Sequence, residues 1–237
     1  GEESFIEQQD IASTLTEQYG ELPGRTLESI PIHDMEQHLQ QIPFVLSAMV
    51  TADMDGTVTV RIRQREAVLR VINGKGSTFY VDQQGLKMPV SLKYVPRVPV
   101  VNGHIAETFE GGRDSIRTQV VRDCLRTARF ISRDSLWSSQ IVQLYVNPQQ
   151  DIELIPRVGR QQIILGDGDS LERKFEKLML FYTKIVPRTG IDAYKTVNLK
   201  FAGQLVCERS DKYRPELLQK QDTTHQHTSN SNNTQAL

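Results

Sequence analysis

The sequence predicts an α+β fold built from two successive modules. Two short helical patterns and an alternating hairpin fill the segment 2–66, and strand-like runs with two longer one-sided helices follow. The chain has 237 residues, of which 38% are apolar, so each module can bury a core of its own. We therefore expect one domain over 2–66, a mixed β-domain over 67–209 and a flexible polar tail over 210–237.

The first module opens with two short helices. Apolar residues recur at helical spacing over 5–19 and again over 33–42. A strand is expected over 44–52, and Asp55-Gly56 then predicts a hairpin turn, because glycine tolerates positive φ. Apolar and polar residues alternate over 57–63, which predicts a strand with one buried and one wet face.

The second module begins with strand-like runs over 68–72, 78–81 and 95–101. The last of these runs contains Pro96 and Pro99, which lack a backbone donor. Because a proline interrupts the ladder inside a sheet, we expect this run at an edge or in an irregular connection.

Two helices in the second module carry one-sided apolar stripes. The first follows Gly111-Gly112, has Asp114 near its N-terminus and runs to Ile131. The second starts with Asp169 as its N-cap and ends before Pro187. Further strands are expected over 141–146, 152–155, 162–165, 196–201 and 204–208.

The composition points away from catalysis and from nucleic acid. A formal net charge of -1 gives no electrostatic reason to bind a polyanion. The few histidines lack the spacing of a metal site, and no cofactor motif or nucleophile elbow is present. Glu107 and Glu110 are interpreted as part of a solvated loop. We therefore expect no enzyme activity, no metal and no cofactor.

The two cysteines and the ends of the chain leave alternatives open. Cys124 lies on a helical apolar stripe, which favours a buried free thiol, although a single bridge to Cys207 is also compatible with the sequence. No apolar run reaches the ~20 residues of a membrane helix. Gly1 has the character of a residue left by tag cleavage, so we expect the sequence to be part of a longer protein.

The segment 2–66 resembles a POTRA domain, a β-α-α-β-β module of cell-envelope proteins. The residues that carry this resemblance are Leu39, Ile42, Pro43, Val45, Ala48, Val50, Val58, Val60 and Ile62. The resemblance implies a first strand that should precede Glu2, so we expect the sheet of this module to lack one edge strand.

The segments that follow resemble the bacterial cell-division family FtsQ/DivIB. Four short motifs follow the POTRA pattern, namely 62–68 (IRQREAV), 80–85 (YVDQQG) with Met88-Pro89, 98–103 (VPVVNG) and 197–201 (VNLKF) followed by Gln204. Together with the POTRA pattern, these five segments share the order and spacing of that family from about residue 35 to 208. Ala67 stands where the family usually has proline, and Asn198 replaces an acidic residue. The Gln-Arg and Met-Pro variants resemble those of Bacteroidetes-type members.

This resemblance implies a non-catalytic scaffold of the divisome. It implies a single helix in the cytoplasmic membrane, with the POTRA and β-domains on the periplasmic side, and partners that include FtsB and FtsL. The family binds its partner at the end of the β-domain, where a partner strand extends the sheet. The matching positions are Lys200, Phe201, Gln204, Leu205 and Val206. Phe201 would be the anchor and Lys200 would pair with a partner carboxylate; the alternative is that Phe201 belongs to the core.

Two other functions compete with this one. A POTRA-bearing transport or outer-membrane assembly module would require further POTRA copies or a barrel of amphipathic strands. An envelope enzyme would require a polar cleft with convergent titratable groups. Neither pattern is found in the sequence.

Overall fold

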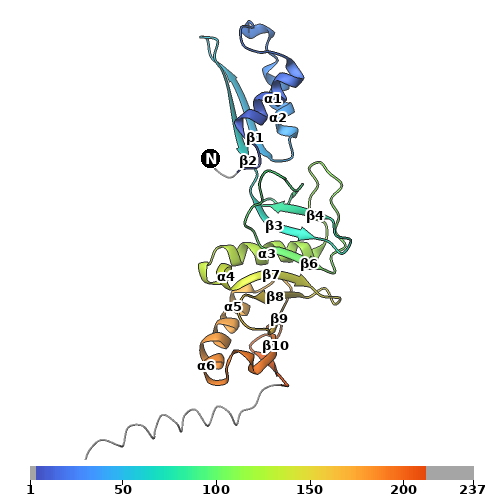
Figure 1. The fold of residues 1–237 in the computed structure, drawn as a ribbon, viewed down its shortest axis with the longest axis vertical. Helices are drawn as coiled ribbons and strands as arrows, with labels where there is room; N and C mark the ends of the chain where they lie inside the picture. Colours follow the sequence, from blue (N-terminus) through green and yellow to red (C-terminus); the bar gives the residue numbers. More distant parts are fainter. Residues whose placement is uncertain (1–3, 212–237) are drawn as a thin grey trace, which may run out of the picture.

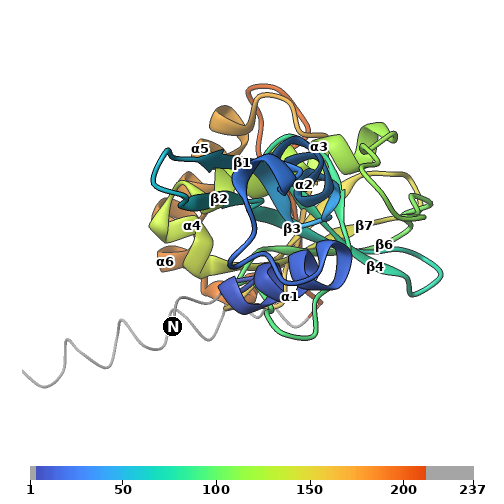
Figure 2. The ribbon, with the colours of Figure 1, turned by 90° about the horizontal axis from the view of Figure 1, so that it is seen from above.

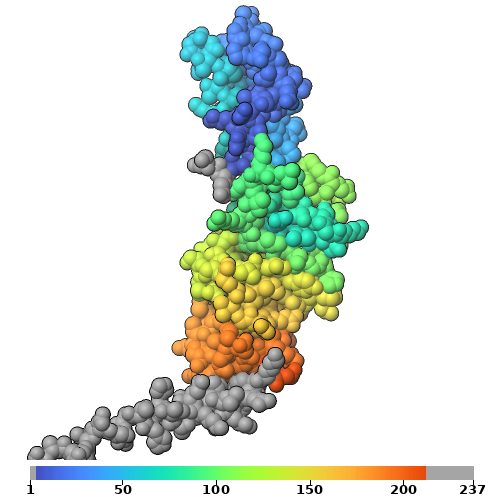
Figure 3. Space-filling model, viewed as in Figure 1, coloured from blue at the N-terminus to red at the C-terminus, as the bar shows by residue number. Residues whose placement is uncertain are grey.

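The computed structural model describes residues 4–211, which form an elongated molecule of two stacked parts (Figure 1). One cluster of buried apolar side chains lies within the larger part, and the other extends from the N-terminal part to Tyr80 and Met88 of the larger part. The view down the long axis places α1 and α2 in front of the larger part (Figure 2), and the space-filling view shows the same stacking (Figure 3). The predicted α+β class, with a helix-and-hairpin module before a mixed β-domain, is confirmed. The tail predicted over 210–237 lies, apart from its first two positions, outside the described residues.

The N-terminal part combines helices α1 (Gln8–Tyr19) and α2 (Ile32–Gln41) with an antiparallel pair of strands, β1 (Val45–Ala52) and β2 (Val58–Gln64). A 3-10 turn, Leu27–Ser29, joins the helices. Residues 4–44 contribute no strand, so the sheet has only these two strands, as expected for a module without its first strand.

The first helix is shorter than predicted. Phe5 and Ile6 precede α1, and their amides donate to the side-chain oxygen of Gln64 at 3.0 and 3.2 Å. The ring of Phe5 stacks on that of Phe44 with the centroids 4.9 Å apart. Packing against the end of β2 therefore holds these two residues outside the helix.

The C-terminal part is one mixed sheet of nine strands. In sheet order the strands are β11 (Val206–Arg209), β10 (Tyr194–Asn198), β9 (Gln162–Gly166), β8 (Ile152–Pro156), β7 (Ile141–Val146), β6 (Val100–Gly103), β3 (Ala67–Ile72), β4 (Thr78–Asp82) and β5 (Lys87–Met88). Strand β6 is parallel to both β3 and β7, and β9 is parallel to β10. All other neighbours are antiparallel.

Of the two positions predicted for the proline-containing run, the structure shows the irregular connection and not the edge. Pro96 and Pro99 lie before β6 in an irregular segment, and β6 itself starts only at Val100. Because the prolines precede the paired residues, β6 can occupy the middle of the sheet without losing ladder hydrogen bonds.

The two ends of this sheet differ. Strand β5 has two residues, and its outer side is covered, because the Lys87 amide donates to the Asp114 carbonyl at 2.7 Å and Leu86 bridges Ser115. Strand β11 is last in the order at the opposite end, and among the described residues no strand lies beyond it. The final predicted strand therefore forms the open edge, whereas 162–165 is internal.

Helices α3 (Gln119–Ser132), α4 (Ser135–Gln140) and α5 (Leu171–Leu180) pack together around one aromatic group. Phe175 of α5 lies with its ring centroid 4.7 Å from that of Phe130 and 4.9 Å from that of Trp137. A π-helical turn (Phe181–Ile185), α6 (Val186–Thr189) and a 3-10 turn (Ile191–Ala193) continue the chain to β10.

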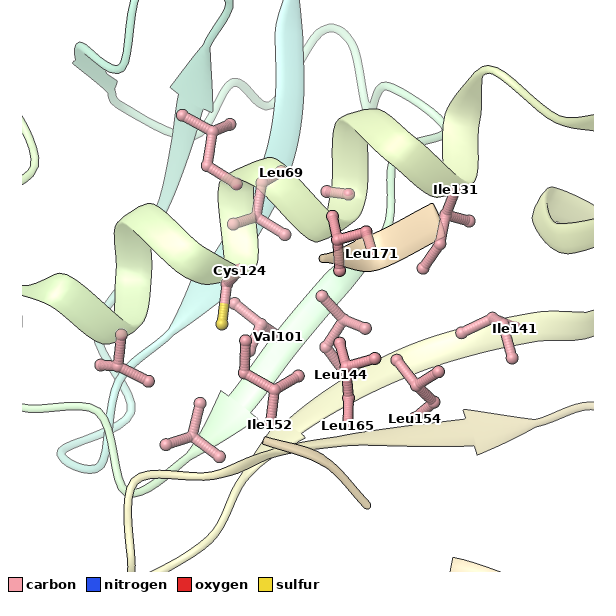
Figure 4. Close-up of a cluster of buried hydrophobic side chains, with 14 of the residues drawn as sticks. Leu69, Val101, Cys124, Ile131, Ile141, Leu144, Ile152, Leu154, Leu165 and Leu171 are labelled. Atoms are coloured by element: carbon pink, nitrogen blue, oxygen red, sulfur yellow. The ribbon is translucent and has the colours of Figure 1, made fainter. Parts of the chain in front are cut away.

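The core of the C-terminal part lies between the sheet and these helices, as Figure 4 shows for Cys124, Val101, Leu144 and Ile152. Cys124 is fully buried, and burial raises the pKa of its thiol far above the ordinary value. Cys124 and Cys207 are both free, so no bridge joins them in this structure.

Both predicted helix N-termini are wrong in detail. Helix α3 starts at Gln119, and Asp114 instead accepts a hydrogen bond from the Lys87 ammonium at 2.7 Å. Helix α5 has Ser170, with φ of 50°, at its N-cap position, while Asp169 pairs with Arg126 at 3.0 Å. The local pattern predicted that each carboxylate lies at a helix N-terminus. In the structure each carboxylate instead forms an ion pair with a residue that is distant in the sequence.

A buried arginine joins the two parts. Arg65 donates to the Asp82 carboxylate at 2.7 Å, to the Pro43 carbonyl at 2.7 Å and to the Lys87 carbonyl at 3.1 Å. The side chains of Arg65 and Asp82 are 1% and 0% exposed. The guanidinium therefore ties the α2–β1 connection to β4 and β5 at a point that water does not reach.

Glu107, which the sequence predicted to lie in a solvated loop, is buried and is the centre of a second set of polar contacts. Its carboxylate accepts from the amides of Arg117 and Thr118, both at 2.8 Å, and from the Thr118 hydroxyl at 2.6 Å. The Lys87 ammonium lies 2.9 Å from it. Glu107, from outside the helix, thus supplies the negative charge that favours the N-terminus of α3.

We expect Glu107 to make the protein sensitive to acid. Burial opposes its ionisation, but the hydrogen bonds from Thr118 and Lys87 outweigh burial, so the pKa of Glu107 lies below its ordinary 4.5. The stabilisation is therefore complete above the ordinary pKa and is lost as the pH falls through the lowered pKa. Glu107→Gln should lose about 2 kcal/mol of unfolding free energy at neutral pH and show a flatter decline in acid.

Urea denaturation from neutral pH down to strongly acidic pH would measure both effects. Glu110→Gln is the matched control, because Glu110 is an exposed carboxylate on the same loop. Equal pH dependence in wild type and Glu107→Gln would contradict the assignment.

Candidate partner-binding site

The predicted partner-binding residues gather around the open edge of the nine-stranded sheet. Strands β10 and β11 are antiparallel, with Val197 opposite Cys207 and Asn198 opposite Val206. Of the five predicted residues, Val206 is the first residue of β11, and the other four lie in the preceding connection. We call residues 199–205, which join β10 to β11, the C-terminal turn.

The predicted strands over 196–201 and 204–208 are both displaced. Strand β10 ends at Asn198, whose side-chain oxygen accepts from the Lys200 amide at 3.0 Å. Gly203 has a φ of 69°, in the region that favours glycine. An Asx-type turn and this glycine therefore end the ladder earlier than the apolar pattern indicated.

Phe201 is not a core residue. Its side chain is 50% exposed, and Val206 nearby is 44% exposed. Leu205 behaves differently, because it is half-buried and packs against the core cluster of the C-terminal part. Leu180 at the end of α5 is also exposed, and with Ala202 and Gly203 it borders a hollow of about 490 Å³ between α5 and the turn.

Lys200 already has a partner inside the chain. Its ammonium lies 2.6 Å from the Asp151 carboxylate in the β7–β8 turn. Its side chain crosses Gly166, where a Cβ atom would come within 2.7 Å of the Lys200 Cγ. A partner carboxylate would therefore have to compete with Asp151 for the Lys200 ammonium.

Lys177 is the residue of this region that sequence reasoning missed. Its ammonium donates to the carbonyls of Leu199 at 2.5 Å, Phe201 at 2.7 Å and Gln204 at 3.3 Å. Burial, together with the nearby charge of Lys174, lowers the pKa of Lys177. Its acceptors belong to a distant part of the chain, beyond the π-helical turn and β10, so no local motif in the sequence could have revealed it.

One exposed ion pair crosses the two last strands. Lys195 and Glu208 lie 2.6 Å apart, and the hydrogen bond from Lys195 lowers the pKa of Glu208. Pairs of this kind on a solvated surface contribute little to stability. The edge thus presents backbone groups of β11, one charged pair and the two apolar side chains of Phe201 and Val206.

Comparison with known proteins identifies both parts of the chain. Residues 66–208, more than half of the sequence, match a family model described as FtsQ/DivIB, C-terminal related. Residues 1–63 match a model described as a POTRA-like domain. No curated protein matches the sequence significantly. Within residues 4–211, no helix has the length and apolar character that crossing a membrane requires.

Proposed function

The chain belongs to the FtsQ/DivIB family, and from this premise we propose that it is a non-catalytic cell-division scaffold that binds other division proteins. The observation that carries this proposal is the open edge of β11 beside exposed Phe201, at the end of the family-matched region. The last strand of a sheet is the place where a partner strand can be added, and the side chains beside it give specificity.

We propose FtsB and FtsL, the small divisome proteins, as the partners. A strand from either protein would pair with β11, and Phe201 would supply an anchor, because an aromatic side chain buries a large area at low entropic cost. In this proposal the parent protein is held in the cytoplasmic membrane by one helix, and the residues described here face the periplasm.

We also propose the domain boundary at 66/67, with Glu66 as the last residue of the first domain. Arg65 and Glu66 are the two residues between β2 and β3. Arg65 is buried and hydrogen-bonded to both parts, which supports a boundary that is short and fixed in geometry.

Phe201→Ala is expected to weaken partner binding by at least about 10-fold, or ~1.4 kcal/mol. Titration of the purified chain with soluble FtsB–FtsL segments from the same organism would measure it. The double change Phe201→Ala, Lys200→Glu should bind more weakly still, provided that circular dichroism shows a native fold.

Met49→Ala is the matched control, since Met49 is a similarly exposed apolar side chain on β1 of the other domain. Unchanged affinity of Phe201→Ala would move the site away from the C-terminal turn. A wild-type chain that shows no binding at about 100 μM, well above the dissociation constants of specific complexes, would refute FtsB and FtsL as partners.

A further inference from the structure

The C-terminal turn is organised around a single ammonium group. Three carbonyl oxygens of the turn, those of Leu199, Phe201 and Gln204, converge on Lys177 Nζ. An ammonium has three donors, so the turn satisfies all of them. Backbone carbonyls that all point inward at one cation leave the side chain of Phe201 on the outer surface, where it is 50% exposed.

The turn has few other restraints of its own. Its hydrogen bonds are that from the Leu199 amide to Ile164, that from the Lys200 amide to Asn198, and a long one of 3.4 Å from the Gln204 amide to Phe201. The Lys200–Asp151 pair holds one further point. Leu205 packs against the core at the far end of the turn. Lys177 adds three hydrogen bonds to the carbonyls of Leu199, Phe201 and Gln204, which lie along the whole turn.

We propose that Lys177 is a positioning residue, which holds the C-terminal turn in the conformation that presents Phe201 to a partner strand. This inference rests on the proposed function for its binding consequence. The physical basis is preorganisation, because a turn that is ordered before binding loses less conformational entropy when the partner docks. Lys177 itself lies on α5, behind the turn, and needs no contact with the partner.

Hydrogen exchange of the free protein tests the positioning role directly. Lys177→Met should speed exchange at the Lys200 and Gln204 amides by about 10-fold, because the turn opens more often, and leave the amides of β7 and β8 unchanged. Lys184→Met is the matched control, because it removes the same charge from an exposed position in the π-helical turn that follows α5. Unchanged exchange in Lys177→Met would overturn the inference.

The binding consequence is read from a double-mutant cycle with Phe201→Ala. Lys177→Met should weaken binding of the FtsB–FtsL segments by about 10-fold in the wild-type background and much less in the Phe201→Ala background, because both changes act on one anchor. Lys177→Arg, which keeps the charge and several donors, should recover part of the loss. Full additivity of the two changes would contradict a positioning role.

The two proposals fail in different ways. A wild-type chain that binds neither segment refutes the proposed partners, whereas the exchange measurement still decides whether Lys177 holds the turn. Faster exchange in Lys177→Met together with unchanged affinity would mean that the turn is ordered by Lys177 but does not contact the partner, and the positioning role would be rejected.

Discussion

Arg65→Met is expected to lower the free energy of unfolding by about 3–5 kcal/mol, because it leaves the Asp82 carboxylate buried without its counter-charge. Asp82 is fully buried and also accepts from the amides of Gln84 and Leu86 at 2.9 and 2.8 Å. These amides compensate only part of the charge. The same change removes two hydrogen bonds to the carbonyls of Pro43 and Lys87, which join the two parts.

Urea denaturation monitored by circular dichroism would measure this loss. Arg63→Met is the matched control, since Arg63 is exposed near the end of β2, and it should change stability by no more than about 0.5 kcal/mol. Arg65→Met combined with Asp82→Asn removes the uncompensated charge and keeps an acceptor for the amides. The double variant should be more stable than Arg65→Met alone; the reverse order would contradict the buried-charge explanation.

Phe175→Ala is expected to cost about 3–5 kcal/mol of unfolding free energy, because it opens a cavity where three helices meet. Phe175 is 2% exposed and contacts the rings of Phe130 and Trp137. Lys177 is also on α5, so looser packing of this helix should weaken the hydrogen bonds from Lys177 that hold the C-terminal turn. Partner affinity should therefore fall even where the variant remains folded.

Thermal denaturation and the partner titration together test this expectation. Phe201→Ala is the control for the loss of an aromatic ring, and it should change stability by about 0.5 kcal/mol or less because Phe201 is exposed. The two variants thus separate stability from binding. A Phe175→Ala protein with wild-type stability would show that the aromatic group is not a packing centre.

The elements that the sequence predicted well are those whose pattern is local. Strict alternation over 57–63 identified β2, and the apolar spacing that ends at Ile131 identified most of α3. The hairpin turn at Asp55-Gly56 follows from a glycine with positive φ. Each of these signals depends on residues a few positions apart, so the chain reveals them without tertiary information.

The errors arise where a distant partner decides the outcome. Asp114 and Asp169 each satisfy a local capping pattern, but Lys87 and Arg126 bind them instead. Glu107 was predicted to be solvated, yet it is buried against Lys87 of β5, a strand that precedes it in the chain. The sequence contains these charges but not their pairing, since pairing depends on how the sheet brings separate segments together.

In the candidate site, too, some features could be predicted from the sequence, while others depend on contacts between distant segments. The region was predicted through resemblance to the FtsQ/DivIB family, and the family match covers it, while the roles of the individual residues stay predictions. Val206 lies on the open strand, but Lys200 is engaged by Asp151. Lys177 was not predicted at all, because its three acceptors are backbone carbonyls, which leave no trace in the side-chain pattern.

The covered end of the nine-stranded sheet has a consequence for assembly. Because the segment around Asp114 closes the β5 side, the sheet formed by the described residues can accept a further strand only at β11. Two copies of the described residues could therefore meet through β11 only as a closed pair, because each copy would then leave only its covered β5 end. Copies that meet through this sheet alone therefore stop at a pair and cannot propagate a fibre.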